Sequence, residues 1–173
     1  MKTMNKLIAT AIVLVGFTAN SFGQVSENMT ASATILSPLN ITNTQNLNFG
    51  RMAATGAAGT VVLAPTILAT RNPTLVTLFT DATVRAASFD VQGAANALYT
   101  IDLSFGSVDL TGAGVDMTAD NWTAGVDGSL TALGTLDAAG DQTFYVGATL
   151  YVNAAQAPGI YTSAPFPITI DYQ

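Results

Sequence analysis

The side chains that could do chemistry in this chain are almost all carboxylates. Beyond residue 23 the sequence has no histidine, lysine or cysteine, so it lacks the usual general base, the thiol nucleophile and the amine of Schiff-base chemistry. Paired carboxylates can hydrolyse glycosides, but the aspartates are spread over glycine-rich sequence, where this residue usually forms Asx-turns. The candidates are Asp109, Asp116, Asp120, Asp127, Asp137 and Asp141. We therefore expect no catalytic residues and no enzymatic activity.

Calcium binding is a better chemical use for these oxygen atoms, which are abundant in residues 109–127. No stretch has the Asp-x-Asp-x-Asp-Gly spacing of a calcium loop, so we assign no metal ligands and expect no cofactor, with Ca²⁺ kept open. The single tryptophan, Trp122, could stack on a sugar ring, but the hydrophobic core or its rim is the usual place for this side chain.

The charge balance excludes two classes of partner. Residues 24–173 contain three arginines and eleven acidic residues, a formal charge of 3 − 11 = −8. A nucleic-acid-binding protein needs a cationic surface, and an anionic membrane also attracts basic segments. We expect neither nucleic-acid binding nor direct membrane insertion.

Residues 1–23 have the features of a secretory signal peptide. Lys2 and Lys6 precede a short uncharged apolar run, and the small residues Ser21 and Gly23 follow at the positions that a signal peptidase requires. The apolar run is shorter than the roughly 20 residues that a membrane-spanning helix needs. We expect cleavage before Gln24 and export of residues 24–173.

The next stretch, residues 24–36, alternates between apolar and polar side chains with the period of a β-strand. Glu27 alone interrupts the apolar row, which consists of Val25, Met29, Ala31, Ala33 and Ile35. Two interpretations stay open. The stretch is either a first strand within its own sheet or an extension that adds to the sheet of a neighbouring subunit.

Residues 37–173 predict one all-β domain. Alternating segments at 87–92, 99–105, 115–119 and 144–152 are separated by Gly, Asn and Asp turn signals, and no helical period appears after the signal peptide. Short strands at this spacing are typical of an antiparallel β-sandwich of Ig-like type. The lack of cysteine means that a hydrophobic core must stabilise the domain.

Residues 160–172 predict a strand with one buried side. Phe166, Ile168, Ile170 and Tyr172 share a face, while Pro165 and Pro167 have the opposite parity. Because proline has no N–H, the prolines damage one hydrogen-bonding edge of this strand. We expect a partner strand to register on residues 168–172 more than on 163–167.

Several segments carry a family resemblance. They occur in the order Leu39-Asn-Ile41, Leu47-Asn-Phe49-Gly50, Phe89-Asp-Val-Gln-Gly93, Tyr99-Thr-Ile101, Phe144-Tyr-Val-Gly-Ala-Thr-Leu150 and Gln156-Ala-Pro-Gly159-Ile-Tyr161. Over residues 30–173 the chain resembles a domain of unknown function common in secreted proteins of the Bacteroidota and other Gram-negative bacteria. That domain is similar to spore-coat-U-type proteins and to chaperone–usher fimbrial subunits, whose last strand has a penultimate tyrosine and a glycine fourteen residues from the end. Tyr172 and Gly159 match this pattern.

The resemblance implies a pilin-like sandwich that lacks one strand. It implies that residues 25–35 are a donor strand for the next subunit, and that a periplasmic chaperone first fills the groove. The implied acceptor residues are Gly159, Phe166, Ile168, Ile170 and Tyr172. The expected location runs from the periplasm to the cell surface or the extracellular space of a Gram-negative bacterium.

The sequence therefore predicts a non-enzymatic structural subunit of a surface fibre, assembled by β-strand donation and self-association. The alternative is a self-complete secreted β-sandwich that binds glycan or Ca²⁺, with residues 25–35 in its own sheet. Whether those residues are donated or kept is left open at this point.

Overall fold

The computed structural model describes residues 24–173, and the predicted signal peptide lies outside the described residues. The chain divides into two units between Thr34 and Ile35. Residues 24–39 form no strand or helix, and residues 24–38 are exposed. No helix within residues 24–173 is long and apolar enough to cross a membrane.

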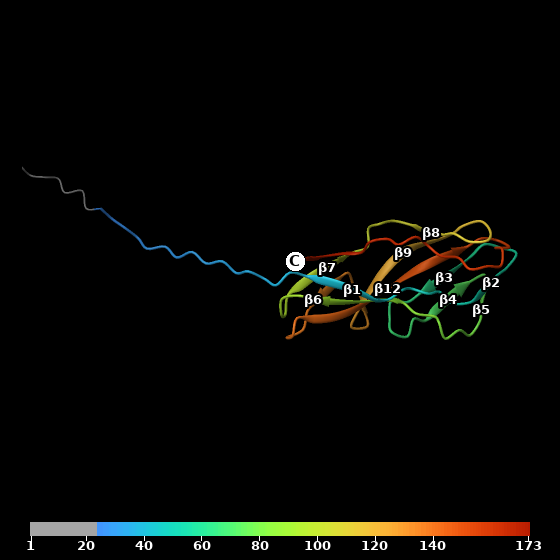
Figure 1. Ribbon diagram of the computed structural model, residues 1–173, viewed down its shortest axis with the longest axis horizontal. Helices are drawn as coiled ribbons and strands as arrows, with labels where there is room; N and C mark the ends of the chain where they lie inside the picture. Colours follow the sequence, from blue (N-terminus) through green and yellow to red (C-terminus); the bar gives the residue numbers. More distant parts are fainter. Residues whose placement is uncertain (1–23) are drawn as a thin grey trace, which may run out of the picture. The chain divides into compact units, whose positions relative to one another are not determined.

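Every regular element of residues 35–173 is a β-strand (Figure 1). The strands are β1 (Asn40–Gln45), β2 (Met52–Ala54), β3 (Gly59–Leu63), β4 (Arg71–Thr74), β5 (Val76–Leu78), β6 (Ala87–Gln92), β7 (Leu98–Asp102), β8 (Val108–Leu110), β9 (Met117–Val126), β10 (Ser129–Leu130), β11 (Leu133–Thr135), β12 (Asp141–Val152) and β13 (Thr169–Tyr172).

The long strand β12 is the centre of the largest sheet. One of its edges pairs with β9, and the other pairs first with β6 and then with β3. Strands β1 and β4 extend the sheet beyond β6 and β3, while β8 and β10 pair with β9. A second layer contains the three-stranded sheet β11–β7–β13 and the pair β2–β5. All pairings are antiparallel, so the predicted antiparallel β-sandwich is confirmed.

The core follows from the alternation of β12. Phe144, Val146, Ala148, Leu150 and Val152 are all at most 3% exposed, because successive side chains of a strand point to opposite faces and these point inward. Phe144 and Val146 belong to one apolar cluster, and the other three belong to a second cluster. Burial of each larger side chain contributes about 1.5–3 kcal/mol, so this strand stabilises both halves of the domain.

The terminal stretch differs from its prediction. A strand was expected over 160–172, but β13 covers only Thr169–Tyr172, and before it a single bridge joins Thr162 to Thr111. Residues 163–168 between them have no strand pairing and contain both prolines. Proline removes the N–H that a sheet needs, which explains why the strand is interrupted there.

Candidate functional site

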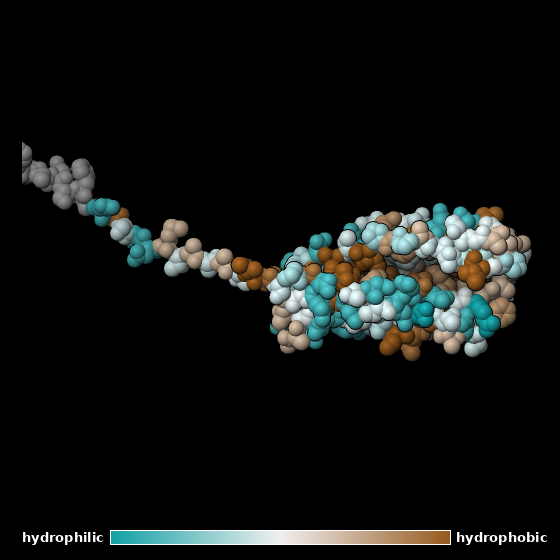
Figure 2. Space-filling view, in the orientation of Figure 1, coloured by the Kyte–Doolittle hydropathy of each residue, from teal (hydrophilic) through white to brown (hydrophobic). Residues whose placement is uncertain are grey.

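The second layer of the sandwich is incomplete. One side of the gap is formed by residues 46–54, which end in β2, and the other side by residues 158–168, which precede β13. Among the pairings of residues 24–173, none joins β2 to β13 or to the segment before it. The gap is a cleft of about 1260 Å³, which appears in Figure 2 as a hollow along the domain with apolar side chains inside it.

The floor of the cleft is the inner face of the large sheet. Strand β9 contributes Met117 and Ala119, and β12 contributes Val146, Leu150 and Val152. All five belong to the buried core and are at most 8% exposed. The cleft therefore opens onto the hydrophobic core itself, which is the environment that an apolar strand face would find in a complete sandwich.

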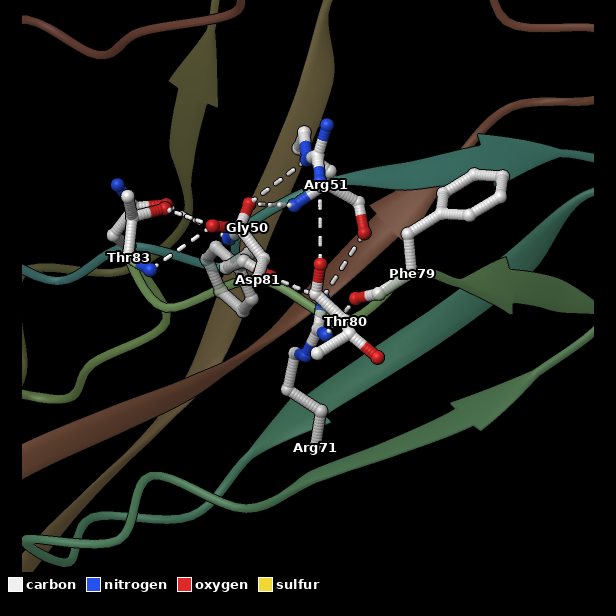
Figure 3. Close-up of polar contacts among 9 residues, drawn as sticks. Gly50, Arg51, Arg71, Phe79, Thr80, Asp81 and Thr83 are labelled. Carbon is white, nitrogen blue, oxygen red and sulfur yellow. Dashed lines mark hydrogen bonds and ion pairs between the residues drawn. The ribbon is translucent and has the colours of Figure 1, made fainter.

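The first wall, residues 46–54, is held by hydrogen bonds from neighbouring segments. Asn48 and Arg85 exchange two backbone hydrogen bonds, of 2.8 and 3.1 Å. The guanidinium of Arg71 donates to the carbonyl oxygens of Phe49 (2.9 Å), Arg51 (3.1 Å) and Phe79 (2.7 Å), as Figure 3 shows in part. One side chain thus connects the wall to the segment that follows β5.

Asp81 fixes the same wall by accepting hydrogen bonds. Its carboxylate accepts the backbone N–H of Arg51 at 2.8 Å and lies 3.6 Å from the Nε of that arginine. It also accepts the N–H and the hydroxyl of Thr83 (Figure 3). The N–H and hydroxyl of Thr83, followed by the contacts with Arg51, hold the pKa of the Asp81 carboxyl below its ordinary value.

The register of β2 determines which of its backbone groups are free for a partner. Ala53 lies opposite Thr77, and the N–H of Phe79 donates to the carbonyl of Arg51 at 3.2 Å. Since neighbouring residues of a strand direct their N–H and C=O groups to opposite edges, those of Met52 and Ala54 point away from β5. This edge of β2 borders the cleft.

The same reasoning applies to β13, which is the last strand of its sheet. The N–H of Gln173 donates to the carbonyl of Leu98, so Asp171 and Thr169 also direct their backbone groups toward β7. The N–H and C=O groups of Ile170 and Tyr172 therefore point away from it. Each piece of the second layer therefore ends in a strand with an unpaired edge, β2 in one and β13 in the other. The edge of β2 borders the cleft, whereas β13 does not line it.

Three aromatic rings pack together at the second wall of the cleft, to which Phe166 belongs. The rings of Phe105, Trp122 and Phe166 have their centroids 5.0–5.1 Å apart in tilted arrangements. The indole N–H of Trp122 donates to the carbonyl of Gly106 at 2.9 Å, and its ring is half-buried against both apolar clusters. Trp122 thus lies at the rim of the core, and both Trp122 and Phe166 line the cleft.

The structure brings together some of the predicted acceptor residues. Gly159, Phe166 and Ile168 line the cleft, whereas Ile170 and Tyr172 do not. Ile170 packs against the core, and the hydroxyl of Tyr172 donates to the carbonyl of Ser37 and accepts from the N–H of Ala94, both at 2.7 Å. The cleft follows residues 158–166 and Ile168. The expected registration of a partner strand on 168–172 stays a prediction.

The predicted donor residues are in the separate unit or at its border. Their side chains are largely exposed, at 88% for Val25, 91% for Met29 and 95% for Ile35. Ala31 and Ala33 are exposed as well. Their donor role stays a prediction.

The first wall of the cleft, residues 46–54, was not predicted from the sequence. Residues 46–54 read as a short strand piece and a small-residue loop, and Arg71 and Asp81 lie in a region without a clear period. A usable signal was present, because Arg51, Arg71 and Arg85 are the only basic residues after position 6 and two of them bind the backbone of this wall.

Several of the candidate aspartates accept hydrogen bonds from the backbone or from neighbouring side chains. Asp137 accepts the N–H groups of Asp141 and Ala139, and these bonds lower the pKa of its carboxyl. Asp109 accepts the Thr118 hydroxyl, and Asp127 accepts the Gln142 amide. Within residues 24–173, no three acidic side chains are grouped so that they could hold a metal ion.

The comparisons with known proteins give a family but no characterised relative. No curated protein and no solved structure matches the chain. A family model matches residues 39–172, more than half of the chain, and that match begins just before β1 and ends within β13. The chain therefore belongs to the family described as Domain of unknown function (DUF4402).

Proposed function

We propose that this protein is an exported, non-enzymatic structural subunit that assembles with copies of itself into a surface fibre by β-strand donation. The observation that carries the proposal is the cleft, whose floor is the hydrophobic core and whose first wall ends in the unpaired edge of β2. The occupant is residues 25–35 of a second copy. The resemblance to spore-coat-U-type proteins and to fimbrial subunits of Gram-negative bacteria agrees with this function, as does a predicted signal peptide.

The chemistry of the extension fits the cleft. A donated strand gains main-chain hydrogen bonds from the open edges and gains specificity from alternate side chains that enter the acceptor. The apolar row supplies Met29 and Ile35 with the small Ala31 and Ala33 between them, and an apolar floor accepts such a row. Burial of the methionine and isoleucine alone contributes about 1.5–3 kcal/mol each.

Before assembly, the open cleft needs a temporary cover, and a periplasmic chaperone that supplies a strand would be suitable. The self-complete alternative, a binding module for glycan or Ca²⁺, has less support. It requires residues 25–35 to pair within their own sheet, and residues 24–39 form no strand in the part of the chain described. Trp122 lines the cleft, but its indole N–H is already donated to Gly106.

The test compares two substitutions in residues 24–173, at neighbouring positions whose side chains would lie on opposite faces of the donated strand. Ala31→Asp places a carboxylate on the apolar row, and burial of an unpaired charge costs several kcal/mol, so polymers should disappear. Ser32→Asp places the same charge on the opposite face and should leave assembly within about threefold of the parent chain. Light scattering and electron microscopy measure assembly, and urea unfolding checks that both monomers keep the parent stability.

The contrary results are also clear. Equal effects of the two substitutions would argue that strand alternation plays no part. If residues 36–173 were as stable as residues 24–173 and neither assembled, strand donation would be excluded.

A further inference from the structure

The outer face of the large sheet is regular and mostly polar. Its residues follow from the register of the strands, because residues opposite each other on neighbouring strands point to the same side of a sheet. One row of side chains crosses β8, β9, β12, β3 and β4, and a second row crosses the last four of these strands. The first row consists of Asp109, Thr118, Tyr151, Thr60 and Thr74, and the second of Asp120, Thr149, Val62 and Asn72. We call these residues the outer platform.

The outer platform lies on the opposite side of the sheet from the cleft. On β12, Thr149 and Tyr151 alternate with Leu150 and Val152, which are at most 3% exposed and belong to the floor of the cleft. Successive side chains of a strand point to opposite faces, so Thr149 and Tyr151 point outward. The residues of the platform do not line the cleft. A ligand on the platform would therefore leave the cleft free for a strand.

Two apolar side chains are exposed in the middle of this polar face. Tyr151 is 42% exposed and Val62 is 45% exposed. Tyr151 lies opposite Thr60 on β3, so Tyr151 and Val62 are diagonal neighbours on adjacent strands, at a separation of about 7–8 Å that an aromatic ring can span. The ring and the aliphatic side chain form a small flat apolar surface, which threonine, asparagine and aspartate side chains surround.

A β-bulge in β9 adds an amide to this surface. The register of β9 against β12 shifts between Asp120 and Thr123, where two residues of β9 lie opposite one residue of β12. Asn121 is one of the two and has a φ of 50°, in the left-handed region that asparagine enters more readily than most residues. Its side-chain amide donates to the hydroxyl of Tyr151 at 2.8 Å. Bulges re-aim side chains, and this one brings an amide to the polar tip of the exposed ring.

We propose that the outer platform binds neutral glycans, with the Tyr151 ring stacked on the apolar face of a sugar. A pyranose has C–H groups on its faces and hydroxyls around its rim, which matches an exposed ring surrounded by polar side chains. The hydroxyl of Tyr151 accepts from Asn121 and so keeps its own proton to donate, and the Asn121 amide has a second N–H. The carboxylate of Asp120 can accept hydrogen bonds from sugar hydroxyls.

The charge of the platform selects the class of glycan. The platform contains Asp109 and Asp120 but no basic residue. The three arginines of residues 24–173 donate instead to backbone carbonyl oxygens of residues 46–51 and 79–80. The carboxylate of a sialic or uronic acid needs a cationic partner, and the two aspartates would repel it. We therefore expect glycans of neutral hexose and N-acetylhexosamine residues.

This inference goes beyond the proposed function and does not depend on strand donation. If the protein forms a fibre, every copy carries the same platform. Repeated platforms would then raise the apparent affinity for a polysaccharide that repeats the same sugar, without any new contact.

A glycan array tests the platform on residues 24–173 with Ala31→Asp, which keeps the chain monomeric under the proposed function. The array carries neutral hexose and N-acetylhexosamine glycans beside sialylated and uronic-acid glycans. We expect binding to neutral glycans, and titration calorimetry with the neutral glycan that binds most tightly gives the Kd. Tyr151→Ala should weaken this binding by about tenfold or more, because the stacking surface is lost.

Two further variants separate the amide of the bulge from an unspecific effect. Asn121→Gly keeps a residue suited to the positive φ and removes only the amide, so it should weaken binding by about threefold or more. Leu130→Ala removes a side chain that is 72% exposed on β10, away from the platform, and should leave the Kd within about twofold. Urea unfolding checks that the variants keep the stability of the parent chain.

The contrary outcomes differ from those of the proposed function. Binding to no neutral glycan, or to anionic glycans alone, would overturn the inference, and so would an unchanged Kd in Tyr151→Ala. These results would leave strand donation intact, because the comparison of Ala31→Asp with Ser32→Asp tests it separately. Glycan binding by the monomer, together with a parent chain that forms no polymers, would uphold the platform and count against the fibre.

Discussion

The three hydrogen bonds of the Arg71 side chain predict how much stability the domain loses when this residue is replaced. Its guanidinium donates to the carbonyl oxygens of Phe49, Arg51 and Phe79 at 2.9, 3.1 and 2.7 Å, and so ties the first wall of the cleft to the segment after β5. A hydrogen bond from a charged donor contributes about 1.5–3 kcal/mol, and less where water competes. The Arg71 side chain is half-buried and two of the three bonds are exposed to water, so we take about 1 kcal/mol for each bond and expect Arg71→Ala to lower the free energy of unfolding by about 3 kcal/mol.

Two further variants separate the effect of the hydrogen-bond geometry of Arg71 from the effect of its charge and from the loss of any arginine. Arg71→Lys keeps the charge but loses the planar fork that reaches several carbonyls, so it should recover less than half of the loss. Arg85→Ala removes one longer bond, of 3.3 Å to the carbonyl of Asn46, and should cost less than about 1 kcal/mol.

Urea unfolding of residues 24–173 gives the free energies, with the slope of the transition as a check that the unfolded state is unchanged. For a domain of this size a loss of about 3 kcal/mol lowers the melting temperature by about 6–12 °C. If Arg71→Ala and Arg85→Ala were equally stable, the three-carbonyl clamp would contribute nothing and the reasoning about this wall would be wrong.

Two further predictions concern the core. Burial, and then the charge of Asp127, raise the pKa of the Tyr99 hydroxyl to about 12. The folded state therefore keeps this proton at a pH where the unfolded chain, with a pKa of about 10, loses it. The urea concentration at the unfolding midpoint should therefore fall as the pH rises between about 10 and 12. Tyr99→Phe should flatten that fall, and an unchanged slope in the variant would assign it to other groups. Gly125→Ala should destabilise the domain by more than about 2 kcal/mol, because its Cβ would overlap the carbonyl oxygen of Pro65. Gly56→Ala, which meets open space, is the control, and equal unfolding midpoints for the two alanine variants would contradict the packing argument.

The alternation of single strands made much of the fold predictable. Residues 144–152 have a clear period of two, and β12 runs through them with the expected residues inside. The region of residues 66–83 had no such period, because its short strands β4 and β5 are positioned by the Arg71 side chain and by pairing with β3 and β2. Such long-range contacts leave no local pattern in a sequence.

The candidate site was only half predictable for the same reason. Phe166 and Ile168 belong to an alternating row that can be recognised locally, so one wall was anticipated. The opposite wall becomes visible only when β2 pairs with β5 and leaves its other edge open. A gap between two strands depends on segments that are far apart in the sequence, so the pattern of either segment alone does not reveal it.

The interruption of the terminal strand has a consequence for behaviour at high concentration. An unbroken row of free N–H and C=O groups along residues 160–172 would pair with any exposed edge and nucleate aggregates. Pro165 and Pro167 have no N–H to offer, and residues 163–168 form no strand. We expect these prolines to act as gatekeepers, because they deny a continuous template to an unrelated strand.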